Sequence, residues 1–229
     1  MLLRLSLTIA LFTISCSRPQ VASQQIAATP SPPTPSAQPS PSATPASAIH
    51  KIDFENFTYP AAPIYPKGEK PFTLKDGEYA GRLQDGAVEP YPVSLVDAFY
   101  GDVTGDRIDD AMLVLTENVR GSAIPYYVYV YGLERDKAKL LWSFYAGDRG
   151  DGGLRQIFAD RGEMVVELYG RDRVVNGGTS SDEDNMGVCC PRFFTRSRYE
   201  WRNGHFRLKS KEAALPNPQG NAAHLPLDR

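Results

Sequence analysis

The sequence predicts an all-β protein whose antiparallel meanders follow a disordered linker. Aromatic and β-branched runs alternate with clusters of Gly, Asp and Asn after residue 49, without a long helical period, which is typical of short antiparallel strands. Eight of the 19 prolines fall within residues 17–48, where Arg18 is the only charged residue. The chain of 229 residues is long enough for one sizeable domain.

The first 16 residues have the features of a secretory signal. Arg4 is followed by an apolar run that is too short to span a bilayer. The run ends in Thr13-Ile14-Ser15-Cys16, which resembles the lipobox of bacterial lipoproteins. This resemblance implies that Cys16 becomes the lipidated first residue of the mature chain and its membrane anchor. The alternative is an ordinary cleaved signal with an incidental cysteine.

Residues 17–48 are expected to form a disordered linker rich in Pro, Ser, Ala and Thr. Such a stretch cannot bury enough apolar surface to offset its ordering entropy, and its prolines favour extended conformations. Fully extended, it could hold a domain up to about 100 Å from its anchor. The predicted organisation is therefore an anchor, a semi-rigid spacer and a β-rich head at residues 49–211.

The first half of the head is predicted to hold an extended lead-in, a hairpin and a four-stranded meander. The hairpin spans residues 72–83 and turns at Asp76-Gly77. In the first meander strand, Val93, Leu95, Asp97 and Phe99 are expected on one face, with Ser94, Val96, Ala98 and Tyr100 on the other. The predicted meander strands are 93–100, 110–116, 125–133 and 139–145.

A second meander is predicted at 154–158, 164–169, 192–201 and 205–208, where Asn203-Gly204 is a strong hairpin signal. Two four-stranded sheets would pack as a sandwich or lie side by side as in a partial propeller. The three tyrosines Tyr127, Tyr129 and Tyr131 share one strand face and are expected in core or inter-sheet packing. Residues 212–229 are expected to be a loosely ordered tail.

An acidic loop at 102–110 places oxygen-bearing side chains at its first, third, fifth and ninth positions. Hard divalent cations take about six to eight oxygen ligands, which a tight loop of alternating carboxylates can bring to one point. The candidate calcium ligands are the side chains of Asp102, Thr104, Asp106 and Asp110 and the carbonyl of Ile108.

This loop is not an EF-hand, because Arg107 stands where that motif needs Gly and Leu113 where it needs Glu. It resembles the calcium loop of FG-GAP and VCBS-type β-propeller repeats, over about one blade from Val93 to Tyr145. The resemblance implies bound Ca2+. The alternative is a structural loop whose Asp side chains accept backbone N–H bonds, with Arg107 neutralising Asp109.

Cys189 and Cys190 are adjacent, so an intramolecular bond between them would be a vicinal disulfide in a strained ring. Reduced thiols, a redox-active pair and a metal clip are the alternatives. The pair follows a long polar insertion, and long loops on a rigid sheet scaffold often carry binding. The candidate binding loop includes Arg171, Asp182, Glu183, Asp184 and Asn185.

Composition excludes some function classes. Residues 49–229 have a formal charge of −4, from 23 basic and 27 acidic residues, and lack the basic excess that nucleic-acid binding requires. The separated histidines His50, His205 and His224 do not favour a zinc site.

The order of short motifs, including Gly-Asp-Val-Thr-Gly-Asp and Cys-Cys-Pro, resembles a group of uncharacterised bacterial exported proteins and lipoproteins. The resemblance implies a location in the cell envelope, facing the periplasm or the exterior. We expect a non-enzymatic binding or structural head that is stabilised by calcium and has an envelope protein or glycan as partner. The alternatives are a metal-assisted hydrolase that uses the Asp102–Asp110 loop and a redox-active vicinal-cysteine protein.

Overall fold

A computed structural model describes residues 48–61, 71–79, 92–117, 124–148, 152–175 and 191–218, and these residues form an all-β domain. The first meander belongs to a five-stranded antiparallel sheet in the order β3-β4-β5-β6-β7. Its members are β3 (Glu78–Tyr79), β4 (Val93–Gly101), β5 (Asp110–Glu117), β6 (Tyr126–Glu134) and β7 (Lys137–Gly147). Within the described ranges, no helix is long and apolar enough to cross a membrane.

The second meander forms a four-stranded antiparallel sheet in the order β11-β10-β9-β8. At its predicted hairpin, Asn203 and Gly204 both adopt positive φ, at 52° and 79°, as a two-residue turn of this type requires. The last strand continues to Pro216, well past the predicted end at Leu208, because it keeps pairing with β10 through two register shifts. The strands are β8 (Leu154–Asp160), β9 (Glu163–Tyr169), β10 (Phe193–Arg202) and β11 (His205–Pro216).

The segment before the sheets is short and irregular. It contains the 3-10 helices η1 (Ala48–Lys51) and η2 (Phe54–Asn56) and a small sheet of β1 (Thr58–Tyr59) with β2 (Phe72–Thr73). The predicted turn at Asp76-Gly77 is present, with φ of 51° and 79°. The strands on either side of this turn do not pair with each other along their length, as the predicted hairpin required. Instead, β2 pairs with β1, and β3 pairs with β4.

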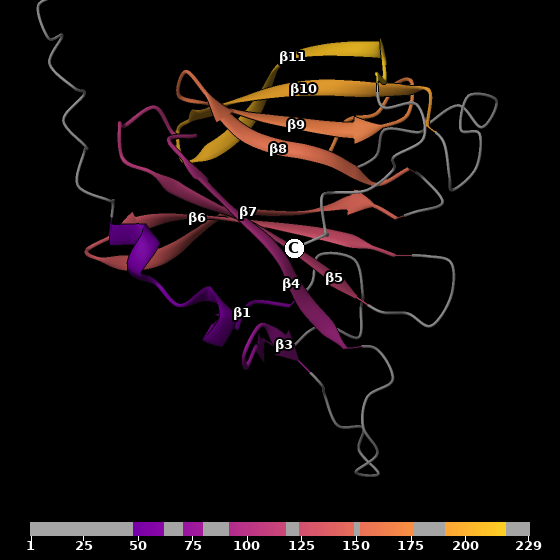
Figure 1. Cartoon of the computed structure of the whole chain (residues 1–229). Coiled ribbons are helices and arrows are strands. Elements are labelled where there is room, and N and C mark those ends of the chain that lie inside the picture. The colour runs from indigo at the N-terminus through magenta and orange to yellow at the C-terminus, as the bar shows by residue number, and fades with distance from the viewer. Residues whose placement is uncertain are drawn as a thin grey trace, which may run out of the picture. The chain divides into compact units, whose positions relative to one another are not determined.

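The two larger sheets pack face to face around an apolar core, as the sandwich alternative predicted (Figure 1). Fully buried side chains reach this core from both sheets, including Met112 and Val128 on one side and Ile157 and Val166 on the other. A fully buried Leu or Val contributes about 1.5–3 kcal/mol relative to an exposed one, so this core is the main stabilising feature of the sandwich.

The opposite face of the five-stranded sheet is covered by residues 48–61 and 71–79, which we call the N-terminal segment. Ile49, Phe54, Tyr59 and Leu74 are buried there against the sheet. The predicted tyrosine stripe forms the sheet side of this second core, where Tyr127, Tyr129 and Tyr131 are at most 3% exposed. The prediction of core packing is confirmed, with the N-terminal segment as the partner. The middle strand β5, buried on both faces, therefore lies between two cores.

The predicted faces of β4 are wrong beyond Val96. A register shift between Leu95 and Asp97 inserts an extra residue, which interrupts the period of two. As a result, Leu95 and Tyr100 both pack against the N-terminal segment, whereas Phe99 packs into the core between the sheets. Strict alternation along the strand had predicted Phe99 on the same face as Leu95.

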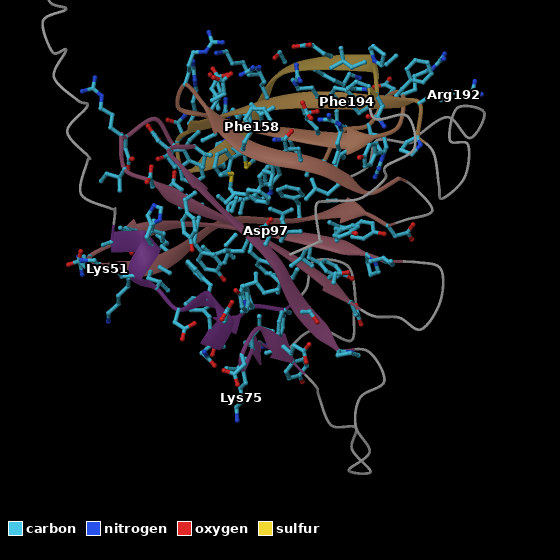
Figure 2. All side chains as sticks on the ribbon, viewed as in Figure 1. Lys51, Lys75, Asp97, Phe158, Arg192 and Phe194 are labelled. Carbon is cyan, nitrogen blue, oxygen red and sulfur yellow. The ribbon has the colours of Figure 1, made fainter. Side chains whose placement is uncertain are left out.

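The antiparallel meanders give the sandwich two distinct ends. We call one the turn end, where the connections 102–109, 135–136, 161–162 and 203–204 lie. The other is the far end, where β5 and β7 finish and β8 and β10 begin. Figure 1 shows η1, in indigo, at the turn end, and Figure 2 labels Lys51 and Arg192 at opposite ends.

Candidate functional site

The acidic loop is folded by its own carboxylates. Asp102 accepts hydrogen bonds from the backbone N–H groups of Gly105 at 2.6 Å and Arg107 at 2.9 Å. Asp106 accepts one from Ile108 N–H at 2.8 Å. These are local side-chain to backbone bonds of the kind that stabilise turns. The loop therefore has the contacts expected of its structural alternative.

Asp110 has the most unusual environment in the loop. The side chain is only 3% exposed, and Oδ2 accepts a hydrogen bond from Val103 N–H at 3.0 Å. Burial raises the pKa of Asp110 from 3.8 to about 6, and the charges of Asp106 and Asp102 add to this rise. The Val103 N–H bond and the nearby Thr104 hydroxyl oppose it. A buried carboxylate of this kind is costly to ionise.

The predicted calcium ligands share this loop but do not form a ready ion site. Among the described residues, no three side chains of His, Cys, Asp or Glu form a group that could hold a metal ion. Asp106 and Ile108 are exposed, whereas Asp110 is buried under the loop. Several carboxylate oxygens are engaged by the loop's own N–H groups. The arrangement does not fit calcium without rearrangement, and calcium binding stays a prediction.

The loop also joins other parts of the head. His50 Nε2 lies 2.9 Å from Asp109 Oδ2, and the His50 ring stacks on Tyr100 with centroids 4.2 Å apart. A Cβ added to Gly162 would lie 3.0 Å from Gly105 Cα, so the β8–β9 turn sits directly against the loop. Sequence reasoning did not assign His50 a role. The available signal was its position beside Ile49, the first buried residue in the part of the chain that the structure describes.

The other predicted site residues are mostly outside the described residues. This group comprises Cys16, Cys189, Cys190 and the acidic run 182–185. Arg171 is described and lies at the far end, just after β9, with its guanidinium 4.8 Å from the centre of the Phe193 ring.

A buried polar network at the far end was missed by sequence reasoning. Arg173 is only 5% exposed and donates to the carbonyls of Tyr169 and Ala146 at 2.9 and 3.3 Å. Its backbone N–H donates to the buried hydroxyl of Thr195 at 2.8 Å. These bonds join Arg173, which precedes segment 176–190, to β9, β7 and β10. No periodic pattern marks Arg173, because it lies in an irregular segment.

The outer face of the four-stranded sheet has a buried carboxylate between two arginines. Glu167 is 1% exposed and forms ion pairs with Arg155 and Arg196. Both guanidiniums also lie over the ring of Phe194, at 4.3 and 5.6 Å from its centre. Buried charges persist only when they are paired in this way. The cluster satisfies its own charges, which is a structural role.

No known protein family, curated protein or solved structure matches this chain. The geometry of the described residues is thus the basis for a functional proposal.

Proposed function

We propose that the chain is a lipid-anchored protein of the cell envelope, whose non-enzymatic β head binds an envelope protein or glycan through its far end. The signal-like N-terminus, Cys16 and the linker composition support the anchor. The observation that carries the binding surface is the opposite placement of the chain's entry point and of the candidate binding segment.

The chain enters the head at the turn end. Ile49 is fully buried in the core that covers the five-stranded sheet, and His50 contacts the acidic loop. The linker therefore joins a firmly packed residue at this end, with no described residue before Ala48. A tether attached here leaves the far end directed away from the attachment point.

The candidate binding loop, residues 171–190, is attached at the far end. Val175, the last of its first five residues that the structure describes, and Pro191, which follows the loop, are both buried, and Asn217 donates to Pro191 O at 2.9 Å. On the first flank, Thr195 accepts from Arg173 N–H and donates to Gly170 O. A segment held on a rigid base is the usual arrangement of a binding loop on a sheet scaffold.

Site-specific photo-crosslinking in the native envelope tests the binding surface. A photoreactive residue would replace exposed Arg192 or Pro218 at the far end, with exposed Asp136 at the turn end as the matched control. We expect one discrete adduct from the far-end positions and none of the same mass from Asp136. Identical adducts from both ends, or none from the far end, would contradict the proposal.

The anchor has its own test. Mass spectrometry of the purified protein should find an acylated Cys16 as the first residue, and Cys16→Ser should move the protein from the membrane fraction to the soluble fraction. An unmodified Cys16 in the native protein would remove the lipid anchor from the proposal. Turnover of an envelope sugar or peptide by the purified protein would overturn the non-enzymatic assignment.

A further inference from the structure

The two described flanks of the candidate binding loop meet the same stretch of chain, which is the end of β11. We call residues 170–175, which follow β9, the first flank, and residues 191–193, at the start of β10, the second flank. In the four-stranded sheet, β11 is a neighbour of β10 but not of β9. Contacts between β11 and the first flank therefore lie outside the regular ladder of the sheet.

An irregularity near the end of β11 serves the first flank. Ala214 N–H donates to Arg171 O at 2.7 Å, and Lys211 Nζ donates to Asp172 Oδ1 at 2.5 Å. Ala214 has a φ of 54°, at a point where the pairing of β11 with β10 shifts register. This left-handed conformation is unfavourable for alanine and persists only where the surrounding contacts fix it. The irregularity thus gives one backbone N–H of β11 to the first flank.

The residue that follows β11 holds the second flank. Asn217 is 8% exposed, and its backbone N–H donates to the carbonyl of Arg192, labelled in Figure 2, at 2.8 Å. Its side-chain Nδ2 donates to Pro191 O at 2.9 Å. The two flanks are also bonded to each other, because Gly170 N–H donates to Phe193 O at 2.9 Å. Residues 211–217 therefore contact two flanks that already contact one another.

The first flank is held by side chains more than by a neighbouring strand. Arg173 N–H donates to the Thr195 hydroxyl at 2.8 Å, and Val175 N–H donates to the Tyr199 hydroxyl at 3.3 Å. Breaking these bonds does not require β9 and β10 to separate. A segment of this kind can open locally while the rest of the fold stays intact.

We propose that residues 211–217 form a latch that couples the two flanks, so that the flanks are held or released together. Local openings of a fold occur in contiguous cooperative units, and the latch and the two flanks are joined by hydrogen bonds into one such unit. The inference rests on the proposed function for the role of the loop. A base that is held in place lowers the ordering cost of binding a partner there, so the latch would regulate the affinity of the loop.

Hydrogen exchange of the purified full-length chain, measured by mass spectrometry without a partner, tests the latch. Asn217→Ala removes the side-chain bond to the second flank, and Lys211→Gln removes the ion pair with the first flank. We expect each substitution to speed exchange in the peptides of both flanks. The increase should be about fivefold for the buried bond of Asn217 and about twofold for the more exposed ion pair of Lys211.

The distribution of the increases between the flanks decides the question. In the double variant, a single unit should show the product of the two increases, about tenfold, at both flanks. Faster exchange confined to the second flank in Asn217→Ala and to the first flank in Lys211→Gln would overturn the proposal. A melting curve would confirm that each variant folds, so that exchange from the folded state is compared.

The matched control is Lys209→Gln, which removes an ion pair of the same kind from the same strand. Lys209 pairs with Glu163 in β9, at the turn end, and should leave exchange at both flanks unchanged. Equal acceleration in this control would mean that β11 loosens as a whole, which would contradict a latch at residues 211–217. Because exchange is measured without a partner, failure of the latch and failure of the far-end crosslinks are distinguishable.

Discussion

Asp110→Asn tests the energetic cost of the buried carboxylate in the acidic loop. Asp110 is 3% exposed, and its pKa is raised from 3.8 to about 6, mainly by burial. Asparagine has nearly the same shape, stays neutral, and keeps an oxygen that can accept the Val103 N–H bond. The substitution therefore removes the ionisation while preserving most of the local packing.

The pKa shift fixes the sign and the magnitude. A carboxyl whose pKa is higher in the folded state binds protons more tightly when folded, so its ionisation destabilises the fold as pH rises from 3.8 through about 6. One pKa unit corresponds to about 1.4 kcal/mol, so the full penalty above pH 7 is about 3 kcal/mol. Asp110→Asn should gain up to this amount at pH 8 and nothing at pH 3.

Urea unfolding at a series of pH values measures the difference in unfolding free energy between the two proteins. The control is Asp136→Asn, an exposed turn residue with positive φ, which should give a small difference that does not change with pH. A difference between Asp110→Asn and the parent that does not grow between pH 4 and 8 would refute the reasoning.

Calcium adds a second arm to this experiment. If the loop binds the ion, millimolar calcium should raise the melting temperature of the parent protein, since a ligand that binds only the folded state stabilises it. Asp110→Asn should lose that response, because it removes a charged ligand. An unchanged melting temperature of the parent in calcium and in chelator would exclude the calcium prediction and leave the structural loop.

Two further predictions concern the cores. In Gly101→Ala the new Cβ would lie 2.6 Å from the Ala159 Cβ, so we expect about 1–3 kcal/mol of destabilisation, and Ala159→Gly should recover most of it in the double variant. An unrescued double variant would mean that the contact between the sheets is not the cause. Tyr131→Phe removes a buried hydroxyl without a hydrogen-bond partner and should leave stability unchanged or raise it by about 1 kcal/mol. Tyr59→Phe removes the bond to Phe54 O and should lower stability by about 1 kcal/mol, so equal effects in the two denaturation curves would contradict the assignment.

The fold was largely predictable, because its main signals are local. The alternation of Tyr127, Tyr129 and Tyr131 with valines correctly indicated that the tyrosine face of this strand is packed in a core. The bulge in β4 was not predictable, because no Gly or Pro marks it and its cause is the pairing with β5. The length of β11 was also missed, since continued pairing with β10 outweighs its weak pattern.

The existence of the acidic loop was predictable, but the arrangement of its side chains and hydrogen bonds was not. The spacing of Asp102, Asp106 and Asp110 correctly indicated a tight acidic connection between two strands. It could not indicate which oxygens the backbone N–H groups would engage, because those bonds depend on the left-handed backbone at Gly105 and Arg107, with φ of 81° and 71°. The pairing of Asp109 with His50 joins residues 59 positions apart, and no local pattern encodes it.

The acidic loop has a structural explanation that does not depend on a bound ion. It connects the first two long strands, receives His50 from the segment where the chain enters, and rests against the β8–β9 turn through Gly105 and Gly162. A junction of three segments at the turn end needs many acceptors for backbone N–H groups, and carboxylates are strong hydrogen-bond acceptors. An ion that drew Asp102 or Asp110 away from these N–H groups would have to replace that support. Calcium binding would therefore be coupled to the packing of the chain's entry point, and replacing His50 by alanine should change the size of any calcium response.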